Sequence, residues 1–139
     1  MCNNENNNCI AEILDVINIL QQNANCADSC LDSCDRGVLG CGVNSLNCNT
    51  RPVILYTCQG NGVPFTMPTT RVADCDATAT SSCVFRVEKL DGNCATFRVL
   101  TPNDETAQYP YTTTNSFFTM NLDCLCAIRC LPDTYVECI

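Results

Sequence analysis

The sequence predicts a mainly β protein, in which an antiparallel, sandwich-like β domain follows a short N-terminal amphipathic helix and a cysteine-rich loop. Three observations support this class. Apolar residues repeat at helical spacing near the start of the chain, a cysteine-dense stretch with few large apolar residues follows, and strand-like segments then alternate with turn residues. We expect four parts: a disordered tail at 1–8, the helix at 9–22, the loop at 23–49 and the β domain at 50–139.

The helix at 9–22 is predicted from the spacing of its apolar side chains. Asn8 stands where an N-cap residue is expected, and Glu12 lies near the positive end of the helix dipole, where a carboxylate is favoured. We expect the apolar stripe to dock on the β domain or on a neighbouring molecule. The stripe comprises Ile10, Ile13, Leu14, Ile17 and Leu20.

The β domain is predicted to begin with a buried strand at 53–57, which ends at a glycine-containing turn at 59–62. Two later strands are expected at 117–120 and 122–131, after a polar connection at 101–115 that contains two prolines. These segments, with the hairpin between them, supply the antiparallel strands of the domain.

The clearest hairpin joins strands at 84–90 and 94–100. A three-residue loop at 91–93 keeps the apolar side chains on one face, whereas a two-residue loop would mix the two faces. The preferred register pairs Phe85 with Val99, Val87 with Phe97, and Arg86 with Arg98. The two arginines are a like-charge pair, and Glu88 can relieve their repulsion diagonally.

Fifteen of the 139 residues are cysteine. A share above roughly 8–10% in a short chain is typical of a disulfide scaffold, and such scaffolds belong to oxidising compartments. The N-terminus, however, has no basic segment followed by an unbroken apolar run, so we expect synthesis in a cytosol without a signal peptide. The odd count leaves at least one thiol for another chain, a metal or chemistry.

We expect part of the disulfide bonding to join separate chains. Cys2, Cys9 and Cys138 are the candidates for intermolecular bonds, because chain ends are usually exposed and reach neighbours with little backbone strain. Cys124 and Cys126 would share one face of the last strand, because side chains alternate along a strand. The other structural or cross-linking cysteines are Cys26, Cys30, Cys34, Cys41, Cys48, Cys124, Cys126 and Cys130.

The composition limits the partners. The formal net charge of −8 argues against binding to nucleic acid or to an anionic membrane surface. No window reaches the roughly 20 apolar residues that a membrane span requires. Charged residues make up 16% of the chain, which suits a surface that packs against copies of itself, and hydrophobic residues make up 46%, which allows a real core.

The sequence gives little support to enzymatic chemistry. It contains no histidine, which removes Ser–His and Cys–His nucleophile pairs and histidine metal sites. No two cysteines stand three apart, so the C-x-x-C spacing of thioredoxin-like centres and zinc knuckles is absent. We therefore assign no catalytic, cofactor-binding or metal-binding residue and expect no enzyme.

Four segments, taken in order, carry a resemblance to a known family. They are 49–57, 84–88, 94–96 with 98–100, and 123–131, whose sequence Asp-Cys-Leu-Cys-Ala-Ile-Arg-Cys-Leu is the strongest of them. With the N-terminal helix and the cysteine-rich loop, they resemble the spore coat protein Y/Z family of spore-forming bacilli, which includes exosporium basal-layer and spore crust proteins.

The resemblance implies a structural protein that has neither catalytic activity nor a cofactor. Members of this family self-assemble into cysteine-crosslinked two-dimensional lattices with hexagonal symmetry. The implied location is the spore surface, in the exosporium basal layer or the coat or crust, after synthesis in the mother-cell cytoplasm. The implied partners are the chain itself and other spore coat or exosporium proteins. Oxidation as the layer matures would reconcile the cysteine content with the absence of a signal peptide.

Two alternatives stay open. A thiol-based metal-binding protein is opposed by the high hydrophobic content, and stoichiometric zinc in the reduced protein would support it. A thiol redox enzyme is less favoured, and a single fast-reacting cysteine would be needed to support it.

Overall fold

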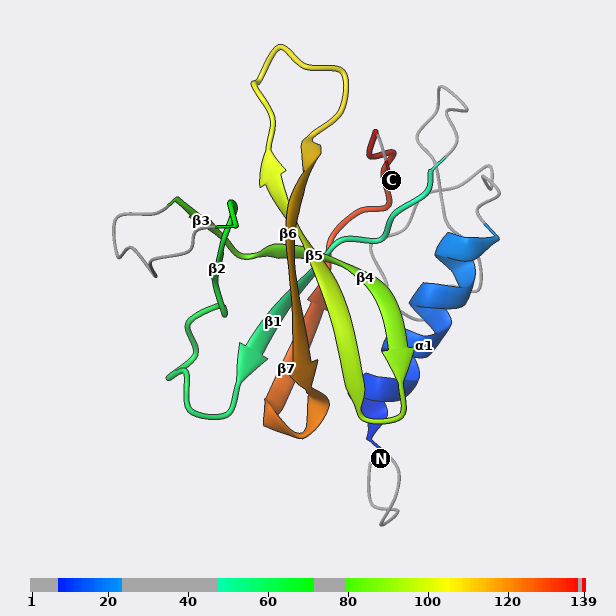
Figure 1. Ribbon diagram of the computed structural model, residues 1–139, viewed down its shortest axis with the longest axis vertical. Coiled ribbons are helices and arrows are strands. Elements are labelled where there is room, and N and C mark those ends of the chain that lie inside the picture. The colour runs from blue at the N-terminus through cyan, green and yellow to red at the C-terminus, as the bar shows by residue number, and fades with distance from the viewer. Residues whose placement is uncertain (1–7, 24–47, 72–79, 138) are drawn as a thin grey trace.

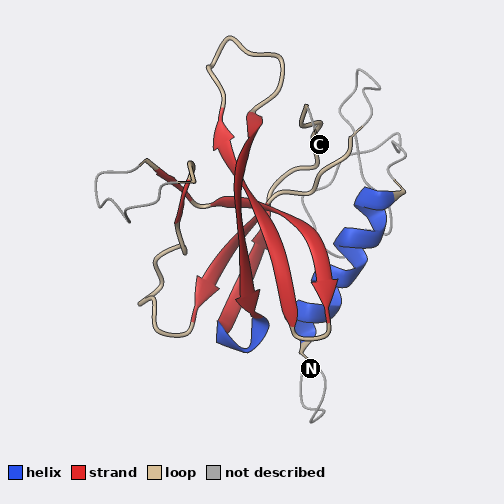
Figure 2. Ribbon diagram, viewed as in Figure 1, coloured by secondary structure: helices blue, strands red, loops and turns tan. Residues whose placement is uncertain are grey.

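The structure is a computed structural model of the 139-residue chain, and it describes residues 8–23, 48–71, 80–137 and 139. The tail predicted at 1–8 and the loop predicted at 23–49 lie almost entirely outside the described residues and stay predictions. Within the described residues the predicted class is confirmed, since strands dominate and a short helix precedes them (Figures 1 and 2).

The described residues form an antiparallel sheet of five strands, in the order β6-β5-β4-β1-β7, and a separate pair of short strands, β2 and β3. β4, β5 and β6 follow one another as a meander, whereas β7 crosses to the far side of the sheet and pairs with β1. In chain order the elements are α1 (Cys9–Gln22), β1 (Val53–Thr57), β2 (Met67–Pro68), β3 (Ser81–Ser82), β4 (Val84–Asp91), β5 (Cys94–Pro102), β6 (Tyr111–Asn121), the 3-10 helix η1 (Leu122–Cys124) and β7 (Leu125–Cys130).

The sheet bends around an apolar core. Phe118 of β6 contacts Phe85 of β4 across the intervening strand, with ring centroids 4.9 Å apart. Phe65, in the segment after β1, packs against both rings at 5.7 and 6.1 Å. Rings on non-adjacent strands therefore meet over this face, and side chains of the sheet itself fill much of the core.

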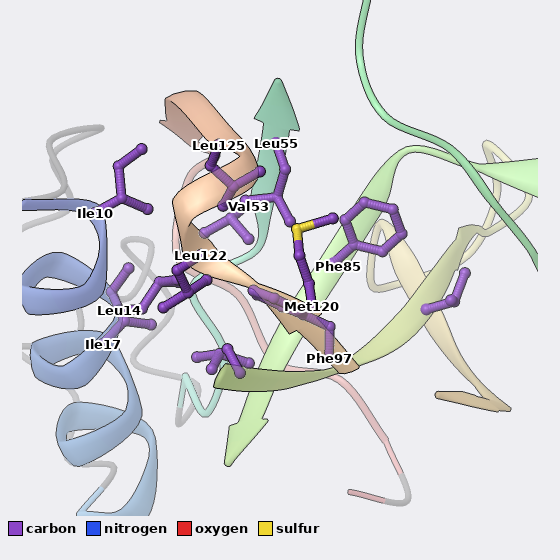
Figure 3. Close-up of a cluster of buried hydrophobic side chains, with 13 residues drawn as sticks. Ile10, Leu14, Ile17, Val53, Leu55, Phe85, Phe97, Met120, Leu122 and Leu125 are labelled. Carbon is purple, nitrogen blue, oxygen red and sulfur yellow. The ribbon is translucent and has the colours of Figure 1, made fainter. Parts of the chain in front are cut away.

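Helix α1 begins and ends at the predicted residues and docks on this core. The Asn8 side chain accepts hydrogen bonds from the amides of Ile10 and Ala11 at 2.9 and 3.2 Å, as an N-cap residue does. Figure 3 shows the buried part of the stripe, Ile10, Leu14 and Ile17, pointing toward Val53, Leu122 and Leu125. The stripe therefore packs on the β domain of its own chain.

Buried polar contacts anchor the end of α1. The Gln21 side chain donates to the Val87 carbonyl at 2.8 Å and accepts from the Arg51 amide at 3.0 Å. The Arg51 guanidinium in turn donates to both carboxylate oxygens of Asp133, at 2.7 and 3.0 Å, and each of these two side chains is 1% exposed. The helix, the sheet and the C-terminal segment are thereby joined through Arg51.

The two residues before Arg51 extend this connection. Asn49 exchanges two hydrogen bonds of 2.9 Å with the backbone of Val136. Thr50 forms a backbone bridge with Thr134 at 3.1 and 3.0 Å. The segment at 49–51 therefore holds the C-terminal residues against the sheet and has a structural role.

The β4–β5 hairpin confirms the predicted side-chain pairs but corrects the predicted loop. The structure pairs Phe85 with Val99, Arg86 with Arg98, and Val87 with Phe97. The loop has two residues, Gly92 and Asn93, because Asp91 still pairs with Cys94. A β-bulge at Glu88 absorbs the extra residue that the prediction placed in the loop. Gly92 adopts a φ of 58°, which suits the first position of a tight hairpin turn.

Glu88 relieves the like-charge pair, as the sequence predicts. Its carboxylate accepts from Arg86 at 2.8 Å and from Arg98 at 3.2 Å. Arg86 also donates to the Thr50 hydroxyl at 2.9 Å. Burial lowers the pKa of Arg86, while the nearby Glu88 carboxylate opposes that shift.

The strands that flank the predicted polar connection are longer than expected. β5 runs to Pro102 and β6 begins at Tyr111, so the connection covers 103–110 and not 101–115. The threonine-rich start of β6 pairs with the end of β5 after a register shift. Threonine favours strands because it is β-branched, and this polar stretch is therefore strand and not loop.

Candidate functional site

The structure describes eight cysteines, which differ in whether they are disulfide-bonded and in how exposed they are. Cys58 and Cys126 form a disulfide, with their Cα atoms 5.0 Å apart. Cys9 and Cys130 are also disulfide-bonded, and Cys48 is buried. The free thiols of the described residues are the half-buried Cys83 and the exposed Cys94 and Cys124.

The candidates for cross-linking at the chain ends are placed in part. Cys9 is the exposed first residue of α1, and because it is disulfide-bonded, a link to another chain through it requires exchange of that bond. The remaining cysteines of the predicted set lie outside the described residues, and their roles stay predictions. They are Cys2, Cys26, Cys30, Cys34, Cys41 and Cys138.

Buried Leu122 organises one end of the molecule, where the start of α1, the β4–β5 turn, η1 and the end of β1 gather (Figure 1). Its N–H donates to the Asn93 carbonyl at 2.8 Å, and its carbonyl accepts from the Asn8 side chain at 3.2 Å. Cys9 follows Asn8 and Cys94 follows Asn93, so both cysteines lie at this end. We name it the cysteine end, defined by Cys9, Cys58, Cys94, Cys124 and Cys126.

A β-bulge brings Cys126 to Cys58. The register between β1 and β7 shifts after Tyr56, and Cys126 is the extra residue of β7 at that shift. On the other side, the Cys58 amide donates to the Cys124 carbonyl at 3.0 Å. Cys58 is therefore bonded to Cys126 and contacts the backbone of Cys124, which has a free thiol, and all three residues are exposed.

The prediction that Cys124 and Cys126 share one strand face is wrong. Cys124 belongs to η1, which Asn121 caps by accepting from the Asp123 amide at 3.0 Å. β7 starts one residue later, at Leu125, so the two cysteines do not belong to one strand. They consequently differ in chemistry, one being a free thiol and the other half of a disulfide.

A cavity of about 520 Å³ opens beside this pair of strands. Its lining includes Cys58 and Cys124, the side chains of Phe65 and Met120, and Asp123. The cavity thus combines sulfur atoms with apolar walls, which suits contact with another apolar side chain more than with a charged ligand.

Two negative observations apply to the described part of the chain. No group of three or more histidine, cysteine or acidic residues is placed there to hold a metal ion. No helix there is long and apolar enough to cross a membrane.

Sequence reasoning missed three cysteines of the described residues. Cys58 directly follows a predicted strand, and Cys94 directly follows a predicted turn. Cysteines at the ends of neighbouring strands can gather at one end of a sheet, and this position was the signal that could have identified them. Cys83 lies beside β4 and packs against a smaller buried cluster with Tyr111. Burial raises the pKa of the Tyr111 hydroxyl, and nearby Cys83 adds to the rise.

Comparison with known proteins gives a match to one family. The sequence model of the family described as spore coat protein Z matches residues 1–110. No curated protein and no solved structure matches the chain. The matched range contains α1, β1 and the β4–β5 hairpin, whereas β6, η1 and β7 lie beyond it.

Proposed function

The chain belongs to the spore coat protein Z family, and we propose that it is a self-assembling structural protein whose copies form a disulfide-crosslinked two-dimensional lattice. Membership implies a structural protein of the spore coat at the spore surface. The proposal adds the lattice, with hexagonal symmetry, and a position in the crust or the exosporium basal layer. It also assigns no catalytic activity to the chain.

The observation that carries the proposal is the chemistry of the cysteine end. Two free thiols, Cys94 and Cys124, and the Cys58–Cys126 disulfide are exposed there, on a domain whose core is apolar. Exposed sulfur can bond to a neighbouring molecule without unfolding, whereas buried sulfur cannot. Exposed cysteines on a domain with an apolar core therefore support the proposal that copies become linked while each domain stays folded.

Assembly would occur in two steps. Repeated contacts between low-charge surfaces and sheet edges would first order the copies, and contacts that do not close on themselves extend into an open array. Disulfides between ordered neighbours would then lock the array, because the effective concentration of facing thiols is high once the copies are in register. Other spore coat or exosporium proteins would join the same layer.

The proposed route to the spore surface begins in the mother-cell cytoplasm, without a signal peptide. The thiols would remain largely reduced there. They would oxidise as the layer matures, so that cross-linking follows placement of the subunits.

The experiment that tests the proposal is negative-stain electron microscopy of the purified protein with and without reductant. We expect regular sheets or crystalline vesicles, which reductant and heat together dissolve. Heat without reductant and reductant without heat serve as the two controls. Dispersed monomers in every condition would refute self-assembly, and zinc analysis and thiol reactivity would then decide between a metal-binding protein and a redox enzyme.

A triple variant tests the predicted role of the chain ends. Replacing Cys2, Cys9 and Cys138 together with serine should leave the subunit folded and make the array less resistant to heat and detergent. The matched control is Cys83→Ser, which removes a half-buried thiol away from the cysteine end. Unchanged resistance of the triple variant would place the intermolecular bonds at other cysteines.

A further inference from the structure

Three cysteines at the cysteine end are joined by one disulfide and one backbone hydrogen bond. Cys58 is bonded to Cys126, with Cα atoms 5.0 Å apart, and its amide donates to the Cys124 carbonyl at 3.0 Å. Cys58 is thus bonded to one cysteine, and its backbone contacts a second, Cys124, which carries a free thiol.

Exposure makes this disulfide reactive. Exchange needs an attacking thiolate and access to a disulfide sulfur, and exposed disulfides are the labile ones in proteins. Cys58, Cys124 and Cys126 are all exposed. Cys94, the other exposed free thiol, is paired with Asn121 across β5 and β6 and has no such contact with the bridge in the described residues.

We propose that Cys58, Cys124 and Cys126 form a disulfide-exchange centre through which one copy of the chain bonds to a second copy without an external oxidant. Cys124 of one copy loses its proton to solvent and attacks Sγ of Cys58 in the other copy. The new bond joins Cys124 to Cys58, the bond between Cys58 and Cys126 breaks, and Cys126 leaves as a thiolate that takes up a proton. One disulfide is exchanged for another, and no net oxidation occurs.

The partner is a second copy because one surface carries both reacting groups. A two-fold axis brings the same patch of each molecule against itself. Such an axis through the cysteine end would set each Cys124 against the other copy's disulfide. The cavity lined by Phe65 and Met120 lies beside these sulfur atoms and offers an apolar contact for the partner.

This inference rests on the proposed function, since it requires copies that meet in solution or in an array. The test begins with the oxidised protein at low pH, where thiols are protonated and exchange stops. The pH is raised to about 8 under anaerobic conditions, near the ordinary thiol pKa, and covalent dimers are followed on non-reducing gels. Equal amounts of unlabelled and isotope-labelled chain are mixed, so that about half of the peptides joined between copies contain one partner of each kind, whereas peptides joined within one chain never do.

We expect peptides of mixed label that join Cys124 to Cys58, while the number of free thiols per chain stays constant. Cys124→Ser should slow dimer formation at least about tenfold, whereas the matched control Cys94→Ser should change it less than about twofold. Circular dichroism of each variant checks folding, and alkylating Cys124 in the wild-type chain should reproduce the effect of the serine variant.

Three outcomes would overturn the inference. Loss of two thiols per cross-link would show oxidation in place of exchange. Peptides joining Cys124 to Cys58 that occur only with a single label, and never with both, would show exchange confined to one chain. Equal dimer formation by Cys124→Ser and wild type would place the bond elsewhere. Regular sheets in the electron microscope alongside any of these results would leave the proposed function standing, whereas absence of sheets would refute the proposed function itself.

Discussion

Removing the charge of Asp133 should destabilise the domain strongly. Its carboxylate receives two hydrogen bonds from Arg51, at 2.7 and 3.0 Å, and both side chains are 1% exposed. In Asp133→Asn the guanidinium remains buried without that anionic partner. Breaking a buried ion pair in this way costs about 3–5 kcal/mol, because a buried charge loses its ion-pair partner.

The assay is urea unfolding of the soluble, reduced protein, followed by far-ultraviolet circular dichroism. A loss of about 4 kcal/mol, with a urea slope of about 2 kcal/mol per molar, lowers the midpoint by about 2 M. The matched control is Asp104→Asn, the same change at an exposed position, which should alter the midpoint by less than about 0.3 M.

A double variant separates the charge effect from packing. Arg51→Met with Asp133→Leu removes both charges, and replacing a buried pair by apolar side chains is often neutral or stabilising. We therefore expect it to be more stable than Asp133→Asn alone. If Asp133→Asn unfolded at the wild-type midpoint, the reasoning would be refuted, and Arg51 would not be what anchors the C-terminal segment to the sheet.

Three further stability effects follow from the structure. Asn8→Ala removes the N-cap of α1 and the hydrogen bond to Leu122, and should cost about 1–2 kcal/mol in thermal unfolding; no change in melting would contradict the capping role. Replacing Cys58 and Cys126 together with serine opens a loop across a sequence separation of 68, which corresponds to about 4 kcal/mol under non-reducing conditions. This difference should vanish in reductant, and a difference that persists would mean that serine disturbs the packing. Gln21→Leu leaves a buried carbonyl and amide without their partner and should cost about 1–3 kcal/mol, with faster amide exchange at the end of α1; unchanged exchange would argue against the anchor.

Local patterns predicted the local elements well. The helix at 9–22 and the strand at 53–57 match the structure residue for residue, because each was read from a periodicity or an apolar run inside a single segment. The apolar pairs of the β4–β5 hairpin were also predicted, since only one register keeps Phe85 and Val87 on the core side.

The hairpin loop shows where such patterns stop being informative. An extra residue in the loop and an extra residue in the strand give the same pairs between 84 and 87, so alternation cannot tell them apart. The structure places the extra residue at Glu88, where the carboxylate contacts Arg86 and Arg98. The contacts of Glu88 with the two arginines accompany the bulge in the strand, and the apolar pattern contains no information on these contacts.

The exchange centre depends on strand order, which the sequence did not reveal. Cys58 and Cys126 are separated by 68 residues and meet because β7 pairs with β1 at the edge of the sheet. Their partnership also needs the bulge in β7, and the free thiol of Cys124 belongs to η1 and not to a strand. Each of these is a tertiary feature that short-range spacing of cysteines does not encode.

Several contacts between β1 and β7 are independent of the disulfide at the cysteine end, and exchange between copies requires such contacts. β1 and β7 are held together by a backbone ladder and by the burial of Leu55 and Leu125, and neither depends on the bridge. Transfer of the Cys58 bond to another copy would remove a restraint on the unfolded chain, worth about 4 kcal/mol, while adding a covalent tie between ordered neighbours. In an array the new covalent tie opposes this loss of stability, because a subunit linked to its neighbours cannot dissociate and has fewer unfolded states available to it.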